Sequence, residues 1–204
     1  NGKIVAVKGL GGFHLAVNAT DEKAVRRLRL RKQRQEKPFA LMVATIEIAE
    51  QLVKISKAEA ACLQSPEKPI LLLPRLENSP IAEAVAPGYQ RLGIMLPYTP
   101  LHYILLDEVQ RALDGAVPAL VMTSGNLSTE PIATTNQKAR TMLGSIADSF
   151  IMHDRDIFRQ VDDSIVHFVG EGLVPLRRAR GYVPTPILSS SVSKQEILAV
   201  GADR

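Results

Sequence analysis

The 204-residue chain contains one cysteine, no tryptophan and few aromatic residues of any kind. The single cysteine, Cys62, excludes an internal disulfide and a cysteine-rich zinc site, and its apolar neighbours favour a small buried residue over a nucleophile. Phe, Tyr and Trp together make up 4% of the sequence, so base stacking is not expected to be the main way of binding nucleic acid. The core is expected to consist of Leu, Ile, Val and Ala.

Long hydrophobic runs and a targeting leader are also missing. No apolar run approaches the roughly 20 residues that cross a bilayer, and no charged segment followed by an apolar one stands at the start. We therefore expect a cytoplasmic protein without a membrane partner. Both ends lie in predicted strands, which indicates a segment of a longer protein. We expect a domain over residues 1–184, followed by a linker and the first strand of a further domain over residues 185–204.

Charge of one sign is not in large excess. Lys and Arg number 25 against 21 Asp and Glu, a mildly basic balance that suits an anionic ligand without requiring a large nucleic acid.

Several nucleotide and metal motifs are also missing. No P-loop signature occurs, and residues 9–12 (Gly-Leu-Gly-Gly) depart from the dinucleotide fingerprint. The four histidines lack metal-ligand spacing, so no metal site is expected. Only His14, beside the glycines, is placed in a site; the others are expected to be structural or exposed.

Hydrophobic runs and turn residues predict a mixed sheet with helices packed against it, an α/β (α+β) fold. Strands and helices alternate in the first part of the chain, and strands adjoin in the last part. The expected strands are 3–8, 39–43, 70–73, 92–96, 118–122 and 150–152, with a hairpin of 164–169 and 173–178. The expected helices begin at Asp21 with Thr20 as cap and at Asn136 as cap, with others at 46–53, 57–63 and 100–113.

The run at 118–122 is followed by hydroxyls, a glycine and a carboxamide. In open α/β sheets the ligand crevice lies outside the carboxyl ends of the strands, where Thr123, Ser124, Asn126 and Ser128 would offer uncharged donors and acceptors. Gly125 would let backbone amides approach a ligand closely. An ordinary strand-to-helix turn uses the same residue types, and the stretch alone favours that interpretation. The glycines of 9–12 indicate either tight bends or close ligand approach.

Positive charge gathers between residues 26 and 37. Arg26, Arg27, Arg29 and Arg31 cannot share one helix face and are expected to be solvated. Three further cations fall where the helix should give way to a turn before Pro38 and could converge on a phosphate or carboxylate. These are Lys32, Arg34 and Lys37. A basic helix end that complements the helix dipole is the equally good alternative.

A second basic group follows the late hairpin. Strand alternation sends Arg177 and Arg178 to opposite faces, so at most one of them points into a site on the sheet. Asp162 and Asp163, which begin the hairpin, could hold magnesium, but adjacent acids at a strand start more often form a turn or pair with arginine.

Four features in this order resemble the YrdC family, whose members make threonylcarbamoyl-adenylate for tRNA modification. They are the glycine turn at 9–12, the basic stretch 31–38, the stretch 123–128, and 162–164 followed by 176–178. Residues 7–14, 96–102 and 177–182 are more similar to the YrdC-like domain of the HypF carbamoyltransferases, which help mature nickel-iron hydrogenases. The resemblance covers most of the chain.

The resemblance implies a twisted open sheet with a basic concave surface that binds ATP, with Mg²⁺. It implies formation of carbamoyl-adenylate from carbamate, which a neighbouring domain of HypF derives from carbamoyl phosphate, and transfer of the carbamoyl group to HypE. Catalysis would use charge stabilisation by Lys32 and Arg34 without a protein nucleophile. The implied nucleotide- and substrate-binding residues are His14, Lys37, Thr123, Ser124, Asn126, Ser128, Arg177 and Arg178.

One departure bears on the substrate. Threonine-using relatives carry a Pro-Thr motif after the first strand, and this chain has the glycine turn there. Without that hydroxyl the site should suit an amino acid less and could take bare carbamate, with Asn18 and His14 replacing some contacts. A threonylcarbamoyl-adenylate synthase for tRNA modification and a double-stranded RNA-binding module stay open as alternatives.

Overall fold

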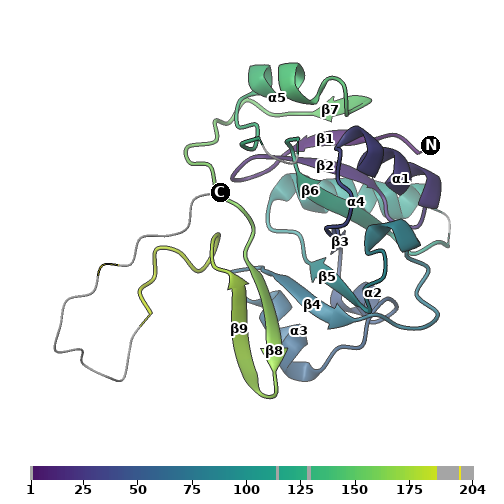
Figure 1. Cartoon of the computed structure of the whole chain (residues 1–204), viewed down its shortest axis with the longest axis vertical. Coiled ribbons are helices and arrows are strands. Elements are labelled where there is room, and N and C mark those ends of the chain that lie inside the picture. The colour runs from purple at the N-terminus through teal and green to yellow at the C-terminus, as the bar shows by residue number, and fades with distance from the viewer. Residues whose placement is uncertain (1, 114, 128–129, 188–197, 199–204) are drawn as a thin grey trace.

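The aliphatic runs pair into one nine-stranded mixed sheet in a computed structural model that describes residues 2–113, 115–127, 130–187 and 198 (Figure 1). The strand order is β7-β1-β2-β6-β3-β5-β4-β8-β9. The strands are β1 (Val5–Lys8), β2 (Phe13–Asn18), β3 (Ala40–Val43), β4 (Ile70–Pro74), β5 (Arg91–Met95), β6 (Ala119–Ser124), β7 (Ser149–Ile151), β8 (Ile165–Val169) and β9 (Gly172–Arg177). The expected α/β class with a mixed sheet is confirmed.

The helices begin where side chains can satisfy their first backbone N–H groups. They are α1 (Glu22–Arg31), α2 (Ile46–Ala49), α3 (Lys57–Gln64), α4 (Pro100–Ala112) and α5 (Asn136–Leu143). Two predicted caps were one residue away from the true ones. Asp21 caps α1 by accepting from the Ala24 N–H, because the Thr20 hydroxyl bonds Asn18 instead, and Thr135 caps α5. The helix predicted over 46–53 ends at Ala49.

Strand β2 was not predicted. It follows the glycine turn at once and lies in the sheet interior, where five of its six residues are buried. Such a strand lacks the alternation of polar and apolar residues that marks a half-exposed strand. It pairs antiparallel with both β1 and β6, and this register puts His14 directly opposite Ser124.

The two faces of the sheet are covered unequally. Side chains along a strand point alternately to the two faces of the sheet. One face carries the larger core, where α1, α2, α3 and α5 pack with Leu15, Leu41 and Leu71. Met42 and Met122 lie on the other face, in a smaller cluster with α4. The part of this second face that α4 leaves uncovered carries the cavity described below.

The last regular elements of the chain form the antiparallel hairpin β8–β9, which extends from the body at one edge of the sheet (Figure 1). It forms where the sequence predicted it. Residues 185–187 have no regular structure, and the remainder of the predicted linker and following strand, apart from residue 198, lies outside the described residues. Among the helices that the structure describes, none is long and apolar enough to cross a membrane.

Candidate functional site

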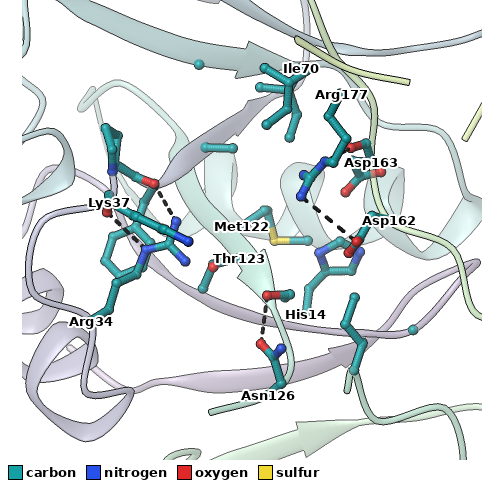
Figure 2. Close-up of a pocket in the computed structure, with 18 of the residues that line it drawn as sticks. His14, Arg34, Lys37, Ile70, Met122, Thr123, Asn126, Asp162, Asp163 and Arg177 are labelled. Atoms are coloured by element: carbon teal, nitrogen blue, oxygen red, sulfur yellow. Dashed lines mark hydrogen bonds and ion pairs between the residues drawn. The ribbon is translucent and has the colours of Figure 1, made fainter. Parts of the chain in front are cut away.

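A cavity of about 640 Å³ opens on the second face of the sheet (Figure 2), within the size range of small-molecule sites. Apolar side chains from the middle strands and β8 form one part of its lining: Ala40, Ile70, Leu72, Met122 and Ile165. Polar and charged side chains from five separate segments form another part: His14, Lys32, Arg34, Lys37, Thr123, Ser124, Asn126, Asp162, Asp163 and Arg177. The cavity therefore offers an apolar floor beside a cationic wall.

The position of the cavity in the sheet differs from the expectation for strand carboxyl ends. The cavity adjoins the carboxyl end of β6, where Thr123 and Ser124 lie, but it also adjoins the amino ends of β2 and β3. Strand β6 is antiparallel to both neighbours. The rule that places ligands at carboxyl ends applies to parallel sheets, so here it holds for β6 alone.

Lys32 follows α1 and is fully buried in the cavity wall. Its Nζ donates to the carbonyl oxygens of Ser124 (2.6 Å) and Asn126 (2.5 Å) and to Oδ1 of Asn126 (2.8 Å). The Ser124 hydroxyl also donates to Oδ1 of Asn126, at 2.7 Å. Burial, together with the nearby Arg34 guanidinium, lowers the pKa of Lys32 to about 7. The ammonium thus fixes the loop after β6 and places positive charge under the cavity.

Arg34 and Lys37 complete the cationic wall from the loop between α1 and β3. The Arg34 guanidinium donates to the carbonyl oxygens of Lys37 (2.9 Å) and Pro38 (2.7 Å) and lies 5.1 Å from the centre of the Phe39 ring. Burial, then the charges of Arg29 and Arg177, lowers the pKa of Arg34 to about 10. Lys37 is exposed at the rim. The structure therefore brings together the three cations that the sequence singled out.

Arg29 was predicted to be solvated, and this was wrong: its side chain is buried and serves the same loop. It donates to five backbone carbonyl oxygens, those of Ala84, Val85, Arg34, Gln35 and Lys37. Only a planar guanidinium with several fixed donors can serve so many acceptors. Arg31 and Arg27 pair with Asp148, so Arg26, paired with Glu22 at the surface, fits the solvated expectation best.

Arg177 and Arg178 separate as strand alternation predicts. Arg177 lines the cavity, with Nε donating to the Asp163 carbonyl oxygen at 2.9 Å and Nη1 3.9 Å from Oδ2 of Asp162. Arg178 is not part of the lining and donates instead to the carbonyl oxygens of Tyr182 and Thr185. Arg177 is therefore the hairpin arginine that can reach a ligand.

Asp163 is an arginine partner, the alternative to magnesium binding that the sequence had left open. Its Oδ1 accepts from Nε of Arg180 at 2.9 Å, and the Tyr98 hydroxyl donates to the same carboxylate. Arg180 also donates to the Glu67 and Lys68 carbonyl oxygens and stacks on the Tyr98 ring at 3.6 Å. Burial raises the pKa of Asp163, but the charges of His14 and Arg180 and the two hydrogen bonds outweigh burial and lower it.

His14 lines the cavity at the start of β2 and is 8% exposed. Its Nε2 lies 3.1 Å from the Tyr98 hydroxyl oxygen. Burial is the largest cause that lowers the pKa of His14, and it outweighs the opposing charge of Asp163. His102 is fully buried beside Tyr98, and burial followed by the charge of His14 lowers the pKa of His102 to about 3. This agrees with the structural role expected for His102.

The glycines allow remote segments of the chain to pack closely on their backbone. A Cβ on Gly11 would collide with Val161, and one on Gly12 would collide with Ile132. A Cβ on Gly125 would lie 2.7 Å from the Phe13 carbonyl oxygen. The segments that carry Val161 and Ile132 can therefore lie directly on the glycine turn, which brings them to the cavity.

Thr123 is buried and lines the cavity, as expected. Ser128 lies outside the described residues. Behind the lining lie Tyr98, which contacts His14, and Arg180, which contacts Asp163; neither was predicted as a site residue. Arg180 stands in the basic stretch that the resemblance used, but no spacing connects it to Tyr98.

Comparison with known proteins identifies relatives over almost all of the chain. The family model Sua5_yciO_yrdC, described as telomere recombination, matches residues 1–179. The carbamoyltransferase HypF of Rhodobacter capsulatus is 50% identical over 202 residues, which are 98% of this chain and 26% of that relative. The chain thus spans about a quarter of the length of the curated relatives that it matches.

Solved structures agree with this result. A full-length HypF in a phosphate- and nucleotide-bound form is 45% identical, with a TM-score of 0.85 over 93% of this chain and 29% of that one. Sua5 of P. abyssi complexed with L-threonine has a TM-score of 0.74 over 87% of this chain and 51% of that one. At 22% identity, the second likeness concerns the fold alone.

Proposed function

Because this chain belongs to the Sua5/YciO/YrdC family, we propose that its cavity binds ATP and carbamate and forms carbamoyl-adenylate. In a protein of HypF type, the carbamate would come from carbamoyl phosphate, produced by a neighbouring domain. The carbamoyl group would then pass to HypE, as a step toward the cyanide ligands of nickel-iron hydrogenase. The carbamoyltransferase relatives and the nucleotide-bound HypF structure support this proposal.

The observation that carries the proposal is the composition of the cavity wall. An apolar floor of Ala40, Leu72 and Met122 suits a base, whereas the cationic wall of Lys32, Arg34 and Arg177 suits phosphates and a carboxylate. A volume of about 640 Å³ can accommodate a nucleotide together with a small acid. Each part of the proposed ligand pair thus has a complementary part of the wall.

The proposed reaction needs no protein nucleophile. A carbamate oxygen attacks the α-phosphorus of ATP, the bond from this phosphorus to the bridging oxygen breaks, and pyrophosphate leaves with both electrons. Negative charge grows on the phosphate oxygens and on the leaving group. Arg34 and Arg177 would bind these oxygens, and the buried ammonium of Lys32 would stabilise the charge from below. Positioning and charge stabilisation are the contributions of the protein.

Mg²⁺ would enter with ATP rather than reside in the protein. Within the described part of the chain, no three His, Cys, Asp or Glu side chains are grouped to hold a metal ion. Mg²⁺ at phosphate sites is held largely by phosphate oxygens and water, with one or two carboxylates at most. Asp162 is one of the carboxylates of the cavity lining that would be able to approach such an ion.

Titration of the chain with MgATP in the presence of different acids tests the proposed function. We expect ammonia plus bicarbonate, the source of carbamate, to strengthen ATP binding and to give ATP-dependent pyrophosphate release. Stronger binding with threonine plus bicarbonate instead would favour threonylcarbamoyl-adenylate synthesis. Absence of ATP binding, with binding of double-stranded RNA that weakens steeply with salt, would favour the RNA-binding alternative.

The lowered pKa of Lys32 predicts a pH effect on nucleotide binding. A lysine loses its positive charge as the pH rises through its pKa, which is about 7 for Lys32. In the ligand-free site, Lys32 is therefore mostly neutral at pH 8. Bound phosphates favour the ammonium form, and binding at pH 8 should therefore take up protons. Calorimetry in buffers of different ionisation enthalpy measures this uptake. The Lys32→Met variant corrects for protons exchanged by ATP itself, and equal uptake by both proteins would contradict the prediction.

A further inference from the structure

Arg180 lies behind the cavity lining, and its side chain is only 10% exposed. Nε donates to Oδ1 of Asp163 at 2.9 Å, and Nη1 and Nη2 donate to the carbonyl oxygens of Glu67 (2.9 Å) and Lys68 (2.8 Å). The guanidinium carbon lies 3.6 Å from the centre of the Tyr98 ring. Each guanidinium nitrogen therefore has an acceptor, and the arginine is held beside the carboxylate of Asp163.

The hairpin β8–β9, which carries Arg177 to the cavity, has a short attachment to the sheet. Strand β8 pairs with β4 at Ile165 and Val166, and β9 is exposed as far as Leu176. Because a two-stranded hairpin is marginally stable by itself, contacts at its base must determine where Arg177 points. One such contact is printed by the backbone of Asp163, whose carbonyl oxygen accepts from Nε of Arg177 at 2.9 Å.

Asp163 thus lies between two arginines and uses a different group for each. Its carboxylate, which is 11% exposed, binds Arg180, whereas its carbonyl oxygen binds Arg177. Nη1 of Arg177 instead lies in the cavity lining, 3.9 Å from Oδ2 of Asp162 (Figure 2). This distance is too long for a hydrogen bond, so Nη1 can still bind a phosphate oxygen.

The charge of Asp163 needs a partner, because its carboxylate is largely removed from water. Removing one member of a buried ion pair leaves a charge without compensation, and that is strongly unfavourable. Arg177 already contacts the backbone of Asp163, so its guanidinium is the cation placed to replace Arg180. The position of Arg177 in the cavity therefore depends on Arg180 keeping the carboxylate occupied.

We propose that Arg180 is a positioning residue that keeps Arg177 available to the phosphates of the nucleotide. Its guanidinium neutralises the Asp163 carboxylate, which would otherwise pair with Arg177 and withdraw that guanidinium from the cavity. This inference rests on the proposed function. It adds a residue outside the cavity lining that determines how much positive charge the ligand meets.

Double-mutant cycles test whether Arg180 acts through Asp163 and Arg177. The readout is kcat/KM for MgATP in pyrophosphate release with ammonia plus bicarbonate. We expect Arg177→Met to reduce it roughly 100-fold and Arg180→Met roughly 10- to 100-fold, the scale on which misplacement of a binding group acts. Adding Arg180→Met to Arg177→Met should cost less than about threefold more, whereas independent effects would multiply.

The second cycle removes the charge of Asp163. Because a neutral amide has no charge with which to capture Arg177, Arg180→Met should cost less than about threefold when it is added to Asp163→Asn. This charge-free pair also keeps the test usable if Arg180→Met alone does not fold, since it leaves no carboxylate without a partner. Arg180→Lys keeps a cation beside Asp163 and should lose less activity than Arg180→Met.

Arg75→Met is the matched control for loss of a structural arginine. The Arg75 side chain is 17% exposed and binds the Ile81 carbonyl oxygen and the Glu83 carboxylate, away from the cavity lining. Its loss and that of Arg180 should both lower the Tm, but Arg75→Met should keep activity within about twofold at a temperature where it is folded.

The two proposals fail in different ways. If the wild-type chain releases no pyrophosphate with any carbamate source, the proposed function is wrong. If the wild type is active, the role of Arg180 is wrong when Arg180→Met keeps that activity. It is also wrong when Arg180→Met costs the same factor with Asp163→Asn or Arg177→Met as without them, and in both cases the proposed function stands.

Discussion

Replacing Lys32 with methionine is expected to reduce carbamate-dependent pyrophosphate release by about 100-fold or more, the scale on which loss of one well-placed charge-stabilising donor acts. The ammonium holds three oxygen atoms of Ser124 and Asn126. A thioether in its place would leave these oxygens without donors and would remove the positive charge under the cavity. Both ATP affinity and the rate at saturation should fall, as steady-state kinetics and calorimetry can measure.

Arg26→Met is the matched control, because Arg26 lies on the adjoining helix and carries the same charge. Its guanidinium is exposed and pairs with Glu22 one turn earlier, an arrangement worth only a few tenths of a kcal/mol. The control should keep activity within about twofold. Similar losses in the two variants would indicate that net charge, rather than a specific site, determines activity.

Much of the sheet could be predicted because its strands are short aliphatic runs fenced by Pro and Gly. Ile70–Pro74 and Ala119–Ser124 both lie where these signals placed them. Phe13–Asn18 escaped prediction, because a strand buried on both faces has no alternating pattern. Local signals also placed both missed caps within one residue, because two neighbouring polar residues precede each helix and either type can act as a cap.

The candidate site was predictable to the extent that its residues cluster along the chain. Lys32, Arg34 and Lys37 drew attention as a group, and all three line the cavity. The contacts among Tyr98, Asp163 and Arg180 join distant segments, and no periodicity encodes such pairing. The glycine turn was recognised but interpreted incompletely, because the segments that pack on it are also remote in sequence.

The family resemblance provided what local physics could not. The order of four weak motifs identified the YrdC family, and the family model and the HypF relatives confirm this. Residue patterns alone led only to an α/β domain with an anion-binding crevice.

Replacing Arg29 with methionine is expected to destabilise the chain by about 2–4 kcal/mol, because a buried side chain that serves five backbone carbonyls is lost. For about 200 residues this corresponds to a fall in Tm of roughly 5–15 °C. Three of the carbonyls belong to the loop that carries Arg34 and Lys37, so ATP affinity should fall as well.

Thermal unfolding of Arg29→Met beside Arg26→Met tests this structural role. The two arginines lie on the same helix and were both expected to be solvated, yet Arg29 is buried and Arg26 is exposed. A Tm change confined to Arg29→Met would assign this arginine to the support of the cationic loop. Equal and small changes in both variants would mean that water replaces its hydrogen bonds, and the loop would then need another source of rigidity to hold Arg34 at the cavity.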